Sequence, residues 1–296
     1  FVAARDGARV VVAEVPFPLR SADEAADAIL GAATERARLA VLSHVTSPTA
    51  LVLPIERIVT ALAERGIDTL VDGAHAPGML PLALDQLGTA YYTGNCHKWL
   101  CAPKGAGFLW VRRDRQERIR PLVVSHGANS PRDDRSRFLL ELDWTGTDDP
   151  TAYLCVPAAI EFLAGLLPGG WPALMAANHA KALAGRDAVL AAVDGRPPVP
   201  DDMLGSMATI LLPADLPPTP PAPAPDAPAD ATLPDDPLHD WLYEQHRVEV
   251  PVMAWPFTPQ AQRPRLRLLR ISAQAYNDQA DYGRLAAALS ERRSAG

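Results

Sequence analysis

The feature that most constrains the fold of this chain is the segment 67–111, where two short apolar runs each lead into chemically active side chains. The first run, Ile67–Val71, is followed by Asp72-Gly73-Ala74-His75, and the second, Ala90–Thr93, by Gly94-Asn95-Cys96-His97-Lys98-Trp99. Short apolar runs that stop at glycine and polar residues are typical of buried strands that end in loops. The sequence between Asp72 and Lys98 is long enough for one crossover, as parallel strands require. We therefore expect two strands of a parallel sheet here.

The side chains that follow these two strands predict a cofactor site. In an open α/β sheet, ligands bind outside the carboxyl ends of the strands, so Asp72, His75, His97 and Lys98 should converge there. Taken singly, such an aspartate is usually a turn or helix-cap residue, and a His-Lys pair is usually solvated surface. Together they suit pyridoxal phosphate (PLP), because a lysine amine forms a Schiff base and a carboxylate keeps a pyridinium nitrogen protonated.

The two motifs resemble those of the class V aminotransferases, a family of fold-type I PLP enzymes, and in particular its isopenicillin N epimerase-like branch. The likeness covers about residues 39–127 and recurs at Trp144–Tyr153 and Arg270–Asn277. It implies an α/β fold with a mostly parallel sheet and flanking helices, followed by a smaller α+β domain. We expect the large PLP-binding domain at residues 1–168 and the small domain at 169–296, with a linker rich in Pro and Ala at 213–237.

The resemblance assigns roles around the PLP ring. Lys98 would form the Schiff base, the internal aldimine, and then move the α-proton of the substrate. Asp72 would pair with the ring nitrogen. His75 and Ser47 would lie near the phenolic oxygen of the ring. The family usually has glycine where this chain has Ala50, which predicts a different path for the loop that carries Ser47.

Other residues match the phosphate and substrate sites of the family. Asn95 and His97 would donate hydrogen bonds to the phosphate. Gly146 and Thr147 match a turn that reaches the partner's phosphate across a homodimer interface. Arg270 matches the arginine that binds the substrate α-carboxylate, where a bidentate fork would orient the substrate. The alternative for Arg270 is a surface arginine.

The motifs predict the cofactor more firmly than the reaction. The same cofactor-binding residues serve several reactions, and the substrate pocket decides between them. We rank an amino-acid epimerase or aminotransferase first and keep a C–S lyase as an alternative. A cysteine desulfurase is disfavoured, since it needs a nucleophilic cysteine well after the lysine and none follows Cys155. Because Phe1 leads at once into a predicted turn and strand, we expect the chain to begin inside a domain. A further alternative is therefore a non-catalytic remnant that lacks part of the cofactor site.

Composition excludes several other classes of function. At 296 residues and 48% hydrophobic content the chain can bury a substantial core. Its net charge of −7 and lack of a basic run argue against nucleic-acid binding. No apolar run approaches the length needed to span a bilayer. Cys96, Cys101 and Cys155 form neither a disulfide framework nor a metal-ligand spacing, which favours a cytoplasmic location. We expect Cys96 and Cys101 to be small buried thiols.

The rest of the chain predicts alternating strands and helices. Predicted strands are residues 10–13, 39–45, 108–111, 207–212, 248–254 and 266–271. Predicted helices are residues 25–34, 55–65, 151–166, 171–193 and 238–246, and a last one from 278. Residues 125–142 are polar, rich in arginine and without a clear period, which predicts a loop.

Overall fold

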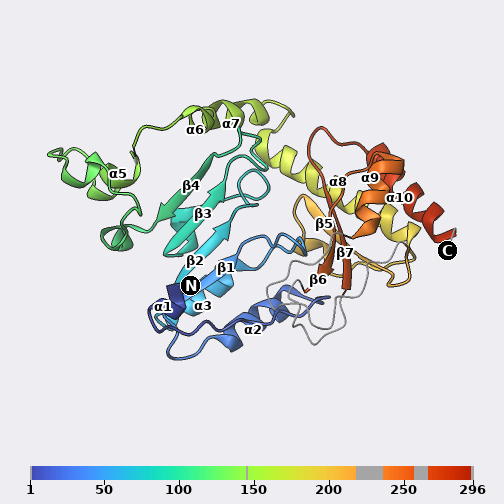
Figure 1. Cartoon of the computed structure of the whole chain (residues 1–296), viewed down its shortest axis with the longest axis horizontal. Coiled ribbons are helices and arrows are strands. Elements are labelled where there is room, and N and C mark those ends of the chain that lie inside the picture. Colours follow the sequence, from blue (N-terminus) through green and yellow to red (C-terminus); the bar gives the residue numbers. More distant parts are fainter. Residues whose placement is uncertain (1, 145, 218–235, 257–265, 295–296) are drawn as a thin grey trace. The chain divides into compact units, whose positions relative to one another are not determined.

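The computed structural model describes residues 2–144, 146–217, 236–256 and 266–294 (Figure 1). The chain forms two compact units. The first comprises Ala33–His44 and Ile55–Gly165 and is called the Lys98 unit below. The second comprises Phe1–Ala32, Val45–Pro54 and Leu166–Gly296 and is called the Arg270 unit.

The Lys98 unit is built on a four-stranded sheet whose strand order is the order of the chain. Its strands are β1 (Leu39–Ser43), β2 (Asp68–Gly73), β3 (Tyr91–Asn95) and β4 (Gly107–Val111). The first three run parallel, and β4 pairs antiparallel with β3. The expected α/β fold with a mostly parallel sheet is therefore confirmed.

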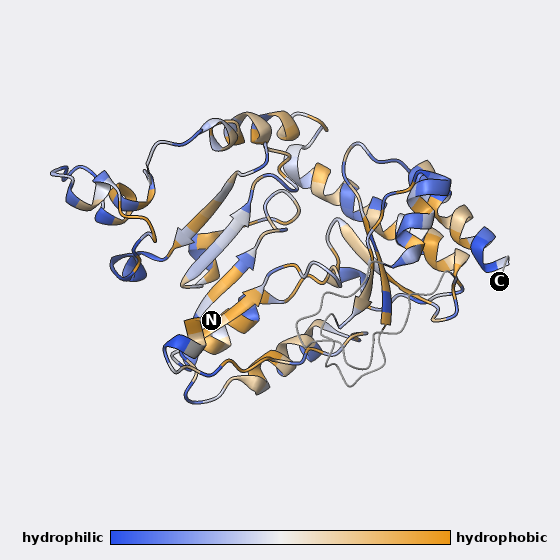
Figure 2. Cartoon of the chain, in the orientation of Figure 1, coloured by the Kyte–Doolittle hydropathy of each residue, from blue (hydrophilic) through white to orange (hydrophobic). Residues whose placement is uncertain are grey.

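One face of this sheet is covered, and the other carries the predicted site. Leu42, Val71 and Tyr92 lie side by side in register and are all buried. Helix α3 (Ile55–Glu64) contacts β2, and all its buried side chains are apolar. Because side chains alternate along a strand, Asp72 points to the opposite face. Figure 2 shows β2 changing from hydrophobic to hydrophilic at its carboxyl end.

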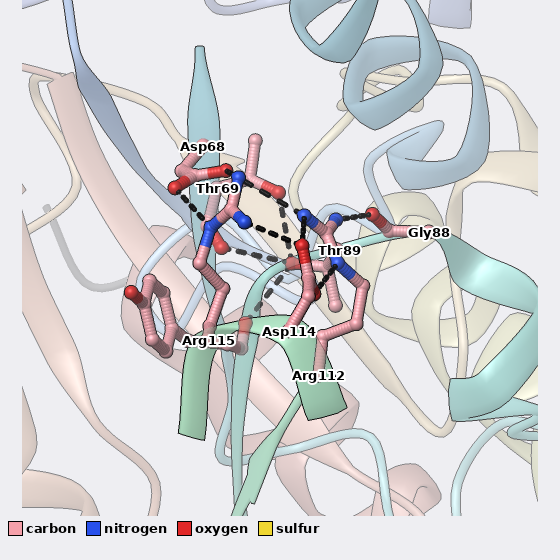
Figure 3. A network of polar contacts seen from close by, with 8 residues as sticks. Asp68, Thr69, Gly88, Thr89, Arg112, Asp114 and Arg115 are labelled. Atoms are coloured by element: carbon pink, nitrogen blue, oxygen red, sulfur yellow. Dashed lines mark hydrogen bonds and ion pairs between the residues drawn. The ribbon is translucent and has the colours of Figure 1, made fainter. Parts of the chain in front are cut away.

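The opposite end of β2 is held by a network of ion pairs (Figure 3). Both carboxylate oxygens of Asp68 accept hydrogen bonds from the Arg115 guanidinium, at 2.7 and 2.9 Å. Asp114 bridges Arg115 to Arg112, which also donates to the carbonyl oxygen of Gly88 at 2.8 Å. The bonded Arg115 lowers the pKa of the Asp68 carboxyl. The charges thus tie β2 to the 3₁₀ helix η1 (Arg113–Arg118) that follows β4.

The remaining elements of the Lys98 unit are short. They are α4 (Leu84–Leu87), η2 (His126–Asn129), α5 (Arg137–Leu142), α6 (Thr151–Leu154) and α7 (Val156–Ala164). The predicted single helix over 151–166 is wrong, because the chain breaks into α6 and α7 at Cys155. Pro157 explains the break, since proline has no N–H for a continuous helix and favours the first turn of a new one.

The Arg270 unit contains an antiparallel three-stranded sheet in the order β5-β7-β6. Its strands are β5 (Met207–Leu212), β6 (Val252–Trp255) and β7 (Leu266–Ser272). Its helices are α1 (Val2–Arg5), α2 (Ala22–Ala32), η3 (Asp201–Met203), α8 (Gly170–Ala192), α9 (Pro237–His246) and α10 (Gln279–Ser294). Helix α8 contacts β5, β7 and α10, so the buried faces of these elements form the core of the unit.

Two segments from the first part of the chain belong to the Arg270 unit. The backbone N–H of Leu19 donates to the carbonyl oxygen of Pro198 at 3.0 Å, and that of Val52 donates to Met203 at 2.8 Å. These hydrogen bonds explain why residues 1–32 and 45–54 group with the C-terminal residues and not with the rest of the predicted domain 1–168. Most of the predicted linker 213–237 lies outside the described residues.

Three further local predictions are wrong. Residues 125–142 do not form a loop throughout, because they contain η2 and α5. Residues 10–13 form no strand, and Val10, Val11 and Val12 are exposed. A run of β-branched residues becomes a strand only where a neighbouring strand pairs with it, and none of the described strands does. Cys101 is exposed, whereas Cys96 is buried as predicted. Across the part of the chain that the structure describes, no helix has the length and apolar character to cross a membrane.

Candidate active site

Asp72 lies at the carboxyl end of β2 with its side chain exposed. Its Oδ1 accepts a hydrogen bond from the backbone N–H of Ala74 at 2.9 Å, and its carbonyl oxygen accepts one from the N–H of His44 at 2.8 Å. Ser43 and Thr93 are its register partners on the two neighbouring strands. The carboxylate is therefore fixed at the strand ends and open to a ligand.

Lys98 is brought to the same edge of the sheet by the loop after β3. Its Nζ lies 3.3 Å from Nε2 of His75, which belongs to the loop after β2. The indole Nε1 of Trp99 donates a hydrogen bond to the other ring nitrogen of His75, Nδ1, at 3.3 Å. The structure thus joins Lys98 and His75, two of the predicted site residues, in direct contact.

The two loops can approach because residue 78 is a glycine. A Cβ at Gly78 would lie 2.7 Å from the carbonyl carbon of Trp99 and 2.9 Å from the nitrogen of Leu100. Gly78 also has a φ of 85°, which side chains of other residues disfavour. Its backbone therefore packs directly against the loop that carries Lys98.

His97 and Asn95 flank Lys98 but differ in their surroundings. Asn95 is the last residue of β3 and is paired with Gly107 in β4. Nδ1 of His97 lies 3.0 Å from the carbonyl oxygen of Ala106 and must carry a proton to bond to it. Nε2 of His97 can therefore donate to a phosphate only when the ring is positively charged. The predicted phosphate contact of His97 stays a prediction with this added condition.

Behind the site, on the covered face of the sheet, lies a buried histidine-tyrosine pair. Nδ1 of His44 and the hydroxyl of Tyr92 are 2.8 Å apart. Burial lowers the pKa of His44 to about 4, and burial together with the charge of Asp72 raises the pKa of Tyr92. A Cβ at Gly73 would lie 2.1 Å from the Tyr92 hydroxyl, so glycine is needed beside Asp72. The pair thus supports the strand end that carries Asp72.

The depressed pKa of His44 predicts a loss of stability in acid. Because His44 has an ordinary pKa near 6.5 when unfolded, the unfolded chain binds more protons between about pH 6.5 and 4. Lowering the pH from about 7 to about 4.5 should therefore cost roughly 2–3 kcal/mol of unfolding free energy through this group. Urea unfolding at both pH values should show this loss in the wild type and lack it in His44→Asn. The exposed His126→Asn serves as the control, and an unchanged pH dependence in His44→Asn would contradict the prediction.

Ser47 and Arg270 are brought together within the Arg270 unit. Nη1 of Arg270 donates to the carbonyl oxygen of Ser47 at 2.6 Å and to its hydroxyl at 2.9 Å. Nε of Arg270 is buried and has no hydrogen-bond partner among the described residues. Burial lowers the pKa of the guanidinium. Ala50 has a φ of 56°, so an alanine here adopts a conformation that glycine adopts more easily.

Gly146 and Thr147 lie in the turn between α5 and α6 of the Lys98 unit. Gly146 has a φ of 127°, and Thr147 is exposed. No hydrogen bond between described residues joins either one to another predicted site residue. Their assignment to the phosphate of a partner subunit stays a prediction.

The sequence interpretation missed Trp99 and Tyr92. Trp99 directly follows Lys98, so its closeness to the site could have been read from the motif, but its hydrogen bond to His75 depends on how the two loops fold back. Tyr92 lies in the predicted strand 90–93, where successive side chains point to opposite faces of the sheet. This alternation could have placed Tyr92 on the covered face. Its pairing with His44 required the parallel register of β1, β2 and β3.

The side chains at this edge of the Lys98 unit suit PLP. Lys98 offers an amine that can react with the aldehyde of the cofactor, and Asp72 offers an exposed carboxylate that can pair with its ring nitrogen. His75 offers a ring nitrogen for a polar atom at the edge of the cofactor. These three side chains would serve the reactive end of the cofactor.

Comparison with known proteins supports the same cofactor. Residues 1–165 match the family described as aminotransferase class-V. Over 286 residues the chain is 36% identical to isopenicillin N epimerase of Amycolatopsis lactamdurans, covering 93% of this chain and 65% of that protein. Over 292 residues it is 30% identical to a probable chloroplastic L-cysteine desulfhydrase of Arabidopsis thaliana, covering 95% of this chain and 58% of that protein. The chain thus spans about three fifths to two thirds of these relatives.

A solved structure shows the same fold. The cysteine desulfurase CsdA of Escherichia coli superposes with a TM-score of 0.71 over 99% of this chain and 68% of the other, at 20% sequence identity. The match of the family to more than half of the chain agrees with the geometry around Lys98. The chain belongs to the class V aminotransferase family of fold-type I proteins, whose cofactor is PLP.

Proposed function

We propose that this protein is a PLP-dependent enzyme that acts at the α-carbon of an amino acid, as an epimerase or an aminotransferase. The observation that supports this most is the contact of Lys98 Nζ with His75 Nε2, beside Asp72 at the ends of parallel strands. When bound, PLP supplies an electron sink for the bonds at the substrate α-carbon. The proposal assigns the tasks described next to side chains of this chain.

Each side chain has a distinct task in the proposal. Lys98 would hold the cofactor through its Nζ, and the same amine would move the α-proton of the substrate. The Asp72 carboxylate keeps a proton on the ring nitrogen, because an opposite charge favours the protonated ring. His75 and Ser47 are the residues that would bond to the phenolic oxygen of the ring. Arg270 binds the α-carboxylate of the substrate.

Only some of the donors of Arg270 are in use within the part of the chain that the structure describes. In the structure Nη1 of Arg270 is already engaged by Ser47, while Nε is buried with no partner among the described residues. A substrate carboxylate would supply an acceptor for the unused donors and a charge for the desolvated guanidinium. We further propose that the phosphate is bound by Asn95 and His97, and by Gly146 and Thr147 of a second copy in a cytoplasmic homodimer.

Replacing Asp72 by asparagine tests the proposal. Asp72→Asn should retain PLP but exchange the substrate α-proton at least ~10²-fold more slowly, equivalent to about 2.7 kcal/mol of barrier, because an amide cannot hold the ring nitrogen protonated. The measurement is α-deuterium exchange over a panel of amino acids with the complete protein. Asp85→Asn, an exposed aspartate of the same unit, is the matched control. Full exchange by Asp72→Asn would show that the carboxylate has a different role.

A C–S lyase is the second candidate, favoured by the 30% identity to a probable L-cysteine desulfhydrase. The same Lys98, Asp72 and His75 would serve, because loss of the α-proton also precedes elimination at the β-carbon. Release of sulfide from L-cysteine, measured beside α-deuterium exchange with amino acids that lack a leaving group, separates the two. Sulfide release without exchange of other amino acids would favour the lyase, and the absence of both would favour a non-catalytic remnant.

A further inference from the structure

The contacts of His75 define which of its ring nitrogens carries the proton. Nε1 of the Trp99 indole can only donate a hydrogen bond, and it donates to Nδ1 of His75 at 3.3 Å. Nδ1 must therefore be the unprotonated nitrogen. In a neutral imidazole the other nitrogen, Nε2, then carries the hydrogen.

The position of that hydrogen constrains the state of Lys98. Nε2 of His75 lies 3.3 Å from Lys98 Nζ. A lysine ammonium has three donors and no acceptor, so it cannot accept a hydrogen bond from Nε2–H. A neutral amine has a lone pair and can. As hydrogen bonds, the two contacts are compatible with each other only if Lys98 is a neutral amine.

We propose that Trp99 is a positioning residue that sets the tautomer of His75, and that this tautomer keeps Lys98 as the neutral amine needed to attack an aldehyde. This inference rests on the proposed function in one respect, that the aldehyde attacked by Lys98 belongs to PLP. It adds a residue that touches neither cofactor nor substrate in the account above. Attack by a lysine requires the unprotonated amine, so the device acts on the first step of cofactor attachment.

The position of the indole is well defined. The Trp99 side chain is buried, with 7% of the residue exposed. The close approach of Gly78 to the backbone of Trp99 and Leu100 fixes the loop from the other side. The N–H of Cys101 donates to the carbonyl oxygen of Lys98 at 3.2 Å, which closes the turn that holds Lys98 and Trp99. The indole therefore stays aimed at His75.

Other charged groups near Lys98 act on the amine as well. The titratable side chains on the segments around it are His44 after β1, Asp72 near the end of β2, His75 in the loop after β2, Tyr92 in β3, and Cys96, His97, Cys101 and Lys104 in the loop after β3. The Asp72 carboxylate would favour the ammonium form by its charge. The Trp99-His75 pair opposes that effect, so removing the indole donor should shift Lys98 toward the ammonium.

The tautomer of His75 can be measured directly in the wild-type protein without cofactor. Long-range ¹H–¹⁵N correlation spectra of protein labelled with [¹⁵N]histidine at neutral pH distinguish the two neutral tautomers and the charged ring. The chain has seven histidines, and the spectrum of His75→Gln identifies the signals of His75. We expect the Nε2–H tautomer. The Nδ1–H tautomer or a charged ring would overturn the proposal.

The reactivity of Lys98 provides the second measurement. Protein is treated with limiting formaldehyde and cyanoborohydride at neutral pH, and methylation of Lys98 is compared with that of the exposed Lys104 by peptide mapping. In Trp99→Phe, which lacks the N–H donor, the ratio should fall about tenfold, because a larger share of Lys98 would be the unreactive ammonium. Trp110→Phe, in β4 of the same unit, should leave the ratio unchanged.

These measurements separate this proposal from the proposed function. Neither contains PLP or an amino acid, so a protein without turnover can still show the expected tautomer and methylation ratio. A folded Trp99→Phe protein with an unchanged ratio refutes the role of Trp99. If Trp99→Phe does not fold, the tautomer of the wild-type protein still decides the question.

Discussion

Lys98→Ala should abolish covalent attachment of PLP and lower α-proton exchange at least ~10³-fold, about 4 kcal/mol of barrier, since both the nucleophile and the proton carrier are lost. Lys98 is in contact with His75 at the strand ends, which places its amine among the residues that suit the cofactor. After borohydride reduction of the complete protein with PLP, peptide mapping should find the pyridoxyl group on Lys98. The visible absorption band of the bound cofactor should be absent from the variant.

The chain offers two matched controls for this experiment. Its other lysines are Lys104, which is exposed in the loop after Lys98, and Lys181, which donates to the carbonyl oxygens of Gln274 and Asn277 in the Arg270 unit. Lys104→Ala and Lys181→Ala should keep the covalent label on Lys98. A label on Lys104, or an unchanged absorption band in Lys98→Ala, would remove Lys98 from the proposed mechanism.

Arg267→Met should destabilise the Arg270 unit by about 3–5 kcal/mol, because it leaves the charge of Asp236 buried without its partner. Nε and Nη2 of Arg267 donate to the two carboxylate oxygens of Asp236 at 2.8 and 2.7 Å, and both side chains are almost fully buried. Nη1 also donates to the carbonyl oxygen of Leu216. The same carboxylate caps α9 by accepting from the N–H of Leu238 at 3.0 Å.

The expected loss can be measured by urea unfolding with hydrogen exchange of the amides of α9 and β7. Arg267→Met/Asp236→Asn should recover much of the stability, because asparagine can still cap α9 but carries no charge to bury. Arg132→Met, which removes an exposed ion pair with Asp134, should have no measurable effect. A change in Arg267→Met as small as in Arg132→Met would show that the buried charge finds another partner.

The sequence predicted the sheet that carries Lys98 better than it predicted the surroundings of Arg270. The runs before Asp72 and Asn95 became β2 and β3 within a few residues of the predicted limits, because apolar runs ended by glycine specify strands locally. The sequence predicted that Lys98 and His75 lie at the same edge of the sheet. It did not predict which ring nitrogen of His75 contacts Lys98. The local hydrophobic pattern was enough to predict this part of the site, because the strands that form it are neighbours along the chain.

Contacts between distant segments were beyond local pattern. The hydrogen bonds of Arg270 with Ser47 join residues that are 223 positions apart, and no periodicity encodes such a pair. The apolar run Val10–Val12 was wrongly assigned to a strand because its pattern lacks information on whether another strand lies beside it. The pairing of Tyr92 with His44 likewise depends on the register of three strands.

The strand order of the two sheets has a consequence for biosynthesis. In the Lys98 unit each strand pairs with the next one along the chain, so the sheet can grow in step with translation. In the Arg270 unit the central strand is β7, the last of the three along the chain, so β5 and β6 cannot join this sheet until β7 has been made. We therefore expect the nascent chain to hold a folded sheet bearing Lys98 before Arg270, the proposed ligand of the substrate carboxylate, has been synthesised.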